Sequence, residues 1–239
     1  MTVLVVGASG ATGSKLVEQL LSDKHKIKVI VRTPEKLPDS WKINTNLQII
    51  SASLLDLSDA EMRTIVSDCE AVASCLGHNL SFKGIYGKPR RLVTDATRRL
   101  CNAITSNNLK SKTKFVLMNT TGNRNRDLNE PISFAQKCVI GLLRVLLPPH
   151  VDNEQAADYL RIEIGQNHTF VEWVAVRPDG LINEDVVTDY EIHPSPTRSA
   201  IFNAGKVSRI NVAHFMANLI TDDNLWAQWK GQMPVIYSS

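Results

Sequence analysis

Residues 2–13, TVLVVGASGATG, join an unbroken apolar run to three glycines that are each three positions apart. The run from Thr2 to Val6 is typical of a strand buried on both faces of a parallel sheet. The first glycine permits a tight turn, the second lets the backbone approach a pyrophosphate, and the third lets a helix pack closely on the strand. Free N–H groups and the positive end of the helix dipole then favour an anion. The sequence therefore predicts a dinucleotide phosphate site, the alternative being a purely structural glycine-rich turn; its residues are Gly7, Ser9, Gly10, Ala11, Thr12 and Gly13.

The rest of the chain alternates apolar runs with segments of helical spacing. Further strands are expected at 27–31, 47–50, 71–75, 115–118, 170–176 and 234–237, and helices at 14–21, 59–66, 90–106, 134–147, 154–164 and 211–220. This alternation predicts an α/β fold, a Rossmann-type doubly wound parallel sheet with right-handed crossovers. Residues 181–210 hold prolines and short mixed segments, which indicate a small C-terminal substrate lobe or lid. No clear linker divides the chain, so we expect one domain over residues 1–239.

Bulk composition excludes several classes of partner. The 239 residues carry a net charge of +3, with 43% hydrophobic and 21% charged residues, which is ordinary for a globular protein. We expect a small-molecule substrate, no nucleic acid and no membrane, and a monomer or homodimer. The four cysteines lack metal-ligand spacing and are expected to be reduced and mostly buried. With no signal peptide visible, the cytoplasm is the expected compartment.

The residue at the end of the second strand bears on which dinucleotide is bound. An acidic residue there would bind the ribose 2′-hydroxyl of NAD, but this chain has Arg32, followed by Thr33 and, nearby, Lys36. A cation at that place suits a 2′-phosphate. The sequence therefore favours NADP(H), with NAD(H) possible; the alternative is a solvated arginine at a strand end.

With these residues identified, the chain resembles the atypical short-chain dehydrogenase/reductase family. More narrowly, it is similar to the NAD(P)H-binding group that includes flavin reductase/biliverdin reductase B and the NmrA-like proteins. The resemblance covers nearly the whole chain and rests on GASGATG (7–13), VIVRTPEKL (29–37), CLGHN (75–79), FVLMNTTG (115–122), VAVRPDGL (174–181) and SRINVAHFM (208–216).

The resemblance implies further cofactor contacts beyond the carboxyl ends of the strands. Leu54 and Leu55 would border the adenine, although the family's usual Gly-Asp pair is replaced here by Ser53-Leu54, with Asp56 as a substitute acidic residue. The remaining implied contacts are Cys75, Leu76 and Gly77 under the ribose and pyrophosphate, Thr120 and Thr121 near the nicotinamide, and Arg177 and Pro178 closing its pocket.

The proton-donating pair of the wider family, Tyr-x-x-x-Lys, is missing. Four residues after Tyr159 stands Glu163, which would not lower a phenol's pKa as a cation does. Thr121 is the first candidate to polarise a substrate carbonyl, or it simply ends a strand beside the cofactor. Asn153 is the second candidate, able to orient the substrate, or else it caps the next helix.

Three histidines and one helix complete the candidates. His78, His150 and His193 are each possible proton donors near neutral pH, although loop histidines are more often solvated. The helix expected at 134–147 is apolar on nearly all faces, so it should be buried, form a dimer contact or wall an apolar substrate. Trp226 and Trp229 are expected to be packing anchors.

Two functions remain open at this stage. The first is an NADPH-dependent reductase that transfers hydride to a small apolar or aromatic carbonyl, flavin or quinone. The second is a non-catalytic NADP(H)-binding redox sensor of the NmrA-like type. A nucleotide-sugar epimerase or dehydratase is disfavoured by the short chain and the absent tyrosine.

Overall fold

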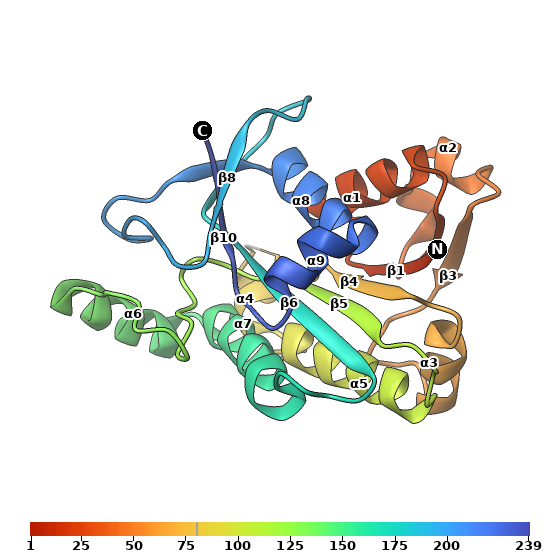
Figure 1. The fold of residues 1–239 in the computed structure, drawn as a ribbon, viewed down its shortest axis with the longest axis horizontal. Coiled ribbons are helices and arrows are strands. Elements are labelled where there is room, and N and C mark those ends of the chain that lie inside the picture. The colour runs from red at the N-terminus through yellow and green to blue at the C-terminus, as the bar shows by residue number, and fades with distance from the viewer. Residues whose placement is uncertain (80) are drawn as a thin grey trace.

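The computed structural model describes residues 1–79 and 81–239 and shows a twisted sheet between two layers of helices (Figure 1). The eight strands of the sheet run in the order β3-β2-β1-β4-β5-β6-β10-β8. They are β1 (Thr2–Val6), β2 (Lys26–Val31), β3 (Leu47–Ser51), β4 (Ala71–Ser74), β5 (Thr113–Met118), β6 (Val171–Pro178), β8 (Tyr190–His193) and β10 (Val235–Ser238). All pairings are parallel except that between β10 and β8. The chain order reverses between β1 and β4, so the predicted doubly wound Rossmann-type fold is confirmed.

Helices cover both faces of this sheet. They are α1 (Ala11–Ser22), α2 (Asp39–Lys42), α3 (Asp59–Val66), α4 (Phe82–Tyr86), α5 (Leu92–Ser106), α6 (Phe134–Leu146), α7 (Pro148–Asp158), α8 (Arg209–Thr221) and α9 (Asp223–Trp229), with a 3-10 turn at Pro34–Lys36 and a π-helical turn at Tyr159–Ile164. One core cluster joins α1, α8 and α9 to one face of the sheet, and a second joins α3, α5 and α7 to the other.

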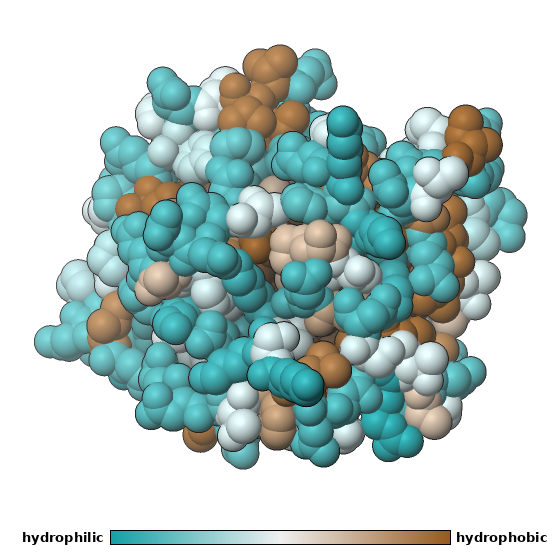
Figure 2. Space-filling model, turned by 45° about the vertical axis from the view of Figure 1, so that its right-hand side comes forward, coloured by the Kyte–Doolittle hydropathy of each residue, from teal (hydrophilic) through white to brown (hydrophobic). Residues whose placement is uncertain are grey.

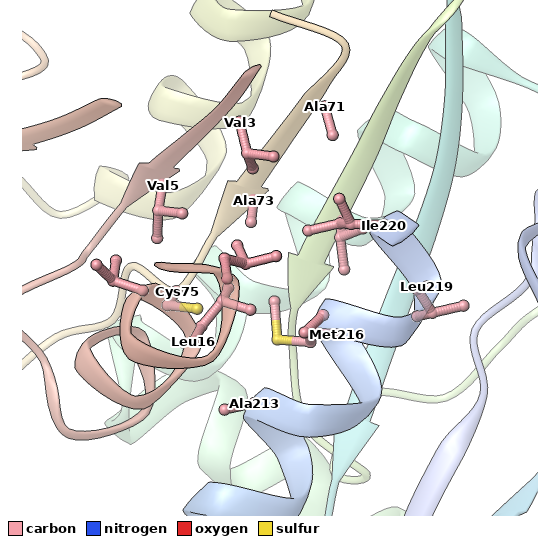
Figure 3. Packing of buried hydrophobic residues seen from close by; sticks show 14 of the residues in the cluster. Val3, Val5, Leu16, Ala71, Ala73, Cys75, Ala213, Met216, Leu219 and Ile220 are labelled. Atoms are coloured by element: carbon pink, nitrogen blue, oxygen red, sulfur yellow. The ribbon is translucent and has the colours of Figure 1, made fainter. Parts of the chain in front are cut away.

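The first cluster fixes the position of the glycine turn. Leu16 of α1 and Met216 of α8 lie over Val5 and Ala73 of the central strands (Figure 3). Cys75, which follows β4, lies in the same cluster and is buried. Because the two central strands and both helices share this apolar contact, the ends of β1 and β4 are held side by side. Trp226 and Trp229 are buried against the same cluster, which confirms their predicted packing role.

The predicted start of the helix expected at 154–164 is wrong, because the helix begins at Pro148. Pro148 and Pro149 follow the end of α6 and form the first turn of α7. The first N–H groups of a helix have no partner within it, so proline is tolerated there. The helical path then widens into the π-helical turn at Tyr159–Ile164.

The segment after β6 is partly separate from the main sheet. β7 (Gly180–Ile182) and β9 (Lys206–Ser208) form a parallel pair of their own. β8 lies between them in the chain, but it pairs with β10 and forms the antiparallel edge strand of the main sheet. This segment includes residues 181–210, for which a small C-terminal lobe is expected, and it borders the carboxyl ends of β6 and β10.

Helix α6 differs from its expected packing. Of its apolar side chains only Ile140 is buried, while Phe134 and Val145 are 81% and 79% exposed. In Figure 1 the helix projects away from the body of the molecule. The alternative that it packs within the core is therefore wrong. Helix α6 lies against α7, the Tyr86 hydroxyl of α4 donates to the carbonyl oxygen of Leu146, and Ser199 of the loop before β9 donates to Gln136.

The face of the molecule drawn in Figure 2 has few exposed apolar side chains gathered together. Figure 2 shows a mostly hydrophilic face on which the hydrophobic patches are small and separate. Three of the four cysteines are buried, and Cys138 on α6 is exposed. None of the helices in the described part of the chain has the length and hydropathy needed to cross a bilayer.

Candidate functional site

The glycine turn is closely packed at two of its three glycines. Gly7 has a φ of +76°, and a Cβ built on it would lie 2.5 Å from the carbonyl carbon of Cys75. A Cβ on Gly13 would lie 2.2 Å from the carbonyl oxygen of Gly7. Both contacts are with backbone, which has no room to move. Only glycine therefore allows β1, the turn, α1 and the end of β4 to meet as they do.

The N-terminus of α1 has no partner for its first N–H groups in the described structure. Gly10 is its N-cap, no side chain caps it, and no acidic residue lies in its first turn. By contrast, α3, α6, α8 and α9 are each capped by the side chain of a serine or aspartate. A turn with unsatisfied donors and a positive dipole end, whose Ser9 and Gly10 are exposed to a ligand, fits a pyrophosphate.

A cavity of about 520 Å³ opens in front of this turn. Its walls include Gly7, Ser9 and Gly10 on one side, and Cys75, Leu76 and Gly77 on the other. Predicted residues from β1, α1 and the loop after β4 are thus brought together. Ala11, Thr12 and Gly13 lie in the first turn of α1, behind this cavity, and Thr12 is buried.

A second cavity, of about 400 Å³, adjoins the first beyond the ends of β2 and β3. Leu54, Leu55 and Asp56 line it, as do Ser53 and Leu76. An apolar slot with one acidic residue at its edge suits a purine ring. The loop after β3 thus lines a cavity, and the contact with an adenine that the resemblance implies stays a prediction.

Arg32 lies between these two cavities and lines both. Its side chain is exposed, and within residues 1–79 and 81–239 it makes no ion pair or hydrogen bond. Thr33 and Lys36 line the phosphate-side cavity next to it. The end of β2 thus offers Arg32 and Lys36, which have no ion-pair partner among residues 1–79 and 81–239, to the phosphate-side cavity.

A third cavity, of about 480 Å³, lies at the carboxyl end of β5. Its walls are formed by the loop that follows β5, by the first half of α6 and by the loop before β9. Thr121 and Gly122 lie at its inner end, and Ile140 of α6 lines one wall. β4 and β5 pair directly, so the loops that line this cavity and the phosphate cavity leave the carboxyl ends of neighbouring strands, although no residue lines both cavities.

Comparison with known proteins identifies the family. A family model described as NAD(P)H-binding matches residues 7–223 of the chain. The chain belongs to this NAD(P)H-binding family. A relative from Arabidopsis thaliana, named as an uncharacterized chloroplastic protein, is 30% identical over 211 residues, which cover 88% of this chain and 69% of the relative.

Solved structures similar to this NAD(P)H-binding protein share its fold. An oxidoreductase from Lactococcus lactis has a TM-score of 0.70 at 16% identity, over 100% of this chain and 91% of the other. A Rossmann-fold NAD(P)-binding family protein from Shigella flexneri has a TM-score of 0.64 at 21% identity, over 99% and 93%. A short-chain dehydrogenase/reductase from Veillonella parvula, solved in complex with NADP, has a TM-score of 0.71 at 16% identity, over 99% and 94%.

In this NAD(P)H-binding protein the hydroxyl of Thr121 already has a partner. Its Oγ1 donates to Oδ1 of Asp179 at 3.1 Å, and Thr121 is 6% exposed. A hydroxyl has one hydrogen, so Thr121 can offer a substrate only its lone pairs while this bond is made. Thr120 next to it accepts a hydrogen bond from the backbone N–H of Gly122 at 3.2 Å.

The guanidinium of Arg177 has no free donor for a cofactor. Its five N–H groups are donated to Glu130, at 2.7 and 3.1 Å, and to the carbonyl oxygens of Met233, Asn123 and Pro194. Arg177 is fully buried and Glu130 nearly so. Asn123 and Pro194 do not line the third cavity themselves, but they lie in the two loops that form opposite walls of it, so Arg177 holds these loops together. Pro178 is also buried and lines none of the three cavities, so within the described residues neither member of the expected pair has a free surface for the nicotinamide end.

Asn153 lies inside α7 and does not cap it. Its Nδ2 donates to the carbonyl oxygen of Pro149 at 3.1 Å. The alternative role of helix cap is therefore wrong, because α7 begins six residues earlier than expected, at Pro148. The carbonyl oxygen of Asn153 accepts from Nδ2 of Asn119, which ties α7 to the end of β5 at 2.9 Å.

Asp152, beside Asn153, is a buried structural residue that the sequence did not single out. Its carboxylate accepts from the backbone N–H groups of Val93 and Thr94 at 2.8 and 2.9 Å, and so caps α5 from another helix. Nε2 of His78 lies 2.7 Å from the same carboxylate. His78 thus links the loop after β4 to α7, and its side chain is 5% exposed. A cap between distant elements leaves no local spacing signal, which explains why it was missed.

His150 and His193 occupy different surroundings. His193, on edge strand β8, pairs with Glu191 at 3.0 Å and lies away from the glycine turn. His150 is 10% exposed, and its Nε2 lies 3.5 Å from Glu154. Its ring lies close to Gly122, since a Cβ built on that glycine would be 3.5 Å from Cε1 of His150. Of the three histidines, His150 is the one beside the end of β5.

Glu154 gives this pair a measurable dependence on pH. Burial alone would raise its pKa, but the neighbouring His150 and Arg144 outweigh burial and lower the pKa from 4.5 to about 2. A lowered carboxyl pKa stabilises the fold above pH 4.5, and this stabilisation is lost as the pH falls towards 2. Between pH 4.5 and pH 2, we expect the free energy of unfolding of the wild type to fall by up to about 3 kcal/mol more than that of Glu154→Gln. Denaturant titration at each pH measures both. Glu163→Gln, an exposed carboxylate, is the control, and an equal pH dependence in wild type and Glu154→Gln would contradict the assignment.

Proposed function

We propose that this protein is an NADPH-dependent reductase of small carbonyl, flavin or quinone substrates. The observation that supports it most is the place of Arg32, which lines both the adenine-side and the phosphate-side cavities without an acidic partner. The glycine turn and the uncapped α1 hold the pyrophosphate, and Leu54 and Leu55 border the adenine. In this arrangement Arg32, with Lys36, binds the 2′-phosphate.

Replacing Arg32 tests the choice of dinucleotide. Loss of a guanidinium–phosphate contact is expected to weaken NADPH binding by about tenfold to a hundredfold in Arg32→Ala, while NADH binding changes little. Fluorescence titration of both nucleotides measures this. Arg63→Ala on α3 removes the same charge away from the cavities and is the control. Equal affinity for NADPH and NADH, unchanged by Arg32→Ala, would show the 2′-phosphate assignment to be wrong.

The reductase chemistry needs little from the side chains. NADPH supplies the hydride when bound, so the protein has to orient the substrate and provide a proton. The third cavity holds the substrate with Thr121 at its inner end. Thr121 and Asp179 position the substrate oxygen through the hydroxyl lone pairs or through an exchanged hydrogen bond. His150 lines none of the three cavities in the described structure, so the proton is assigned to solvent that enters the third cavity.

A turnover assay tests the reductase directly. NADPH oxidation is measured against a panel of flavins, quinones and aromatic aldehydes. The proposal predicts a substrate-dependent rate for at least one class. Binding of NADPH without its oxidation by any of these compounds would contradict the reductase proposal and support the redox sensor.

One observation favours the sensor as the second candidate. None of the four tyrosines lines the three cavities in the described structure, and the hydroxyl of Tyr159 faces Asn102 on α5. The proton of Thr121 is also donated to Asp179. A sensor is expected to bind NADPH and NADP+ with different affinities and to oxidise no panel member.

A further inference from the structure

The third cavity has an unusual charge distribution for a site that would take a neutral carbonyl compound. Its charged lining residues are Arg124, Arg198 and Glu130. Glu130 is held by two hydrogen bonds to Arg177, so its charge is compensated within the fold. The cavity therefore presents two cations without a compensating anion of its own.

Arg124 is the more informative of these cations. Within the described residues it has neither an ion-pair nor a hydrogen-bond partner, and its Nε is buried without one. The other arginines of this region are paired with carboxylates, namely Arg126 with Asp158, Arg144 with Glu154, Arg161 with Asp127 and Asp158, and Arg177 with Glu130. A buried guanidinium donor left unpaired costs stability, because it loses water without gaining an acceptor. Such a group is typical of a site in which a ligand supplies the acceptor.

The surroundings of Arg124 carry further positive charge. Arg124 also lines an adjoining cavity of about 300 Å³, together with Lys137 and the Arg144–Glu154 pair. On the opposite wall Arg198 lies over the ring of Tyr237, 5.6 Å from its centroid. Neither Lys137 nor Arg198 has an acidic partner in the described residues.

The rest of the third cavity is mainly apolar. Pro131, Ile132 and Ile140 line one side, and Pro196 and Ala200 line the other. The polar side chains between the walls are already paired, since Ser199 donates to Oε1 of Gln136 at 2.9 Å. An apolar enclosure with one unpaired guanidinium matches an amphiphilic molecule with one anionic end.

We propose that the substrate of this site carries a carboxylate on an apolar or aromatic body, and that Arg124 binds the carboxylate. This inference rests on the proposed reductase and names its substrate class. Arg124 is a specificity-determining residue that touches the substrate, and Arg198, which is exposed, adds a weaker attraction at the mouth. Arg124 lies two residues beyond Gly122, so a bound carboxylate places the substrate body against the Thr121–Gly122 turn.

Binding of a matched pair of probes tests this without requiring turnover. Calorimetric titration compares 2-naphthoate with the neutral 2-naphthamide on the full chain saturated with NADP+, and again on the chain without nucleotide. The carboxylate is expected to bind about tenfold to a hundredfold more tightly than the amide. Arg124→Ala and Arg124→Gln are expected to remove this preference, and Arg124→Lys to keep part of it. Arg126→Ala, in the same loop but paired with Asp158, is the control that keeps the preference.

Turnover then separates this inference from the proposed reductase. With 4-formylbenzoate and benzaldehyde, the ratio of kcat/KM values is expected to favour the carboxylate and to fall to about one in Arg124→Gln. Equal binding of naphthoate and naphthamide, or a preference that survives both uncharged Arg124 variants, would overturn the inference. Carboxylate-selective binding with no NADPH oxidation would support Arg124 while contradicting the reductase.

Discussion

Arg177→Met is expected to lower the free energy of unfolding by about 3–5 kcal/mol, because it leaves the Glu130 carboxylate buried without its cation. The same change removes five hydrogen bonds from a fully buried guanidinium. Since Arg177 joins the Asn123 loop, Glu130 and Pro194, both walls of the third cavity are expected to loosen. Denaturant titration measures the loss.

A double variant separates the unpaired charge from the lost packing. Adding Glu130→Gln to Arg177→Met removes the orphaned negative charge but keeps an acceptor for the backbone N–H of Asn125, which Glu130 binds at 2.8 Å. The double variant is expected to be more stable than Arg177→Met alone. A single variant within about 1 kcal/mol of the wild type would contradict the structural role given to Arg177.

Gly13→Ala is expected to weaken dinucleotide binding by about a hundredfold or more. Its Cβ would lie 2.2 Å from the carbonyl oxygen of Gly7, so α1 must move away from the turn. The N–H groups at the start of α1 then no longer meet the same anion as the Gly7–Gly10 backbone, and two charge-assisted hydrogen bonds are lost or strained. NADPH and NADH are affected alike, in contrast to Arg32→Ala, because the pyrophosphate is common to both.

A glycine that has room for a side chain is the matched control for this effect. A Cβ on Gly141 of α6 would meet nothing within 4 Å. Gly141→Ala is therefore expected to leave nucleotide affinity unchanged. Wild-type affinity in a folded Gly13→Ala variant would show that the dinucleotide does not bind over this turn.

The sequence was sufficient to predict the parallel strands of the sheet, although not the antiparallel edge strand β8, and the cofactor contacts stay predictions. Buried parallel strands have nearly continuous apolar runs, so β1 and β2 were evident from composition alone. The glycine turn needs its three glycines for steric reasons that the structure shows at Gly7 and Gly13. Arg32 was predictable because its place depends only on the end of β2.

The substrate end was harder to predict, because it depends on contacts between distant segments. Glu130, Asp152 and Asn119 hold loops to other helices and strands, and no periodicity in the sequence marks such partners. A proline pair is typical of a helix end, but proline also suits the first turn of a helix. Because Pro148 and Pro149 begin α7, Asn153 lies in the interior of the helix and not at its cap. The apolar composition of α6 did not reveal that the helix projects from the body. The unpaired state of Arg124 depends on which acids its neighbouring arginines bind, which only the three-dimensional arrangement shows.

The most direct test of the reductase is transfer of deuterium from NADPH labelled at both hydrogens of nicotinamide C4. The protein is incubated with labelled NADPH and 4-formylbenzoate, and the product is analysed by mass spectrometry. A reductase with its substrate against the Thr121–Gly122 turn is expected to yield alcohol carrying one transferred deuterium, and Gly13→Ala is expected to yield almost none. Bound NADPH that transfers no deuterium to this or any other panel substrate would contradict the account.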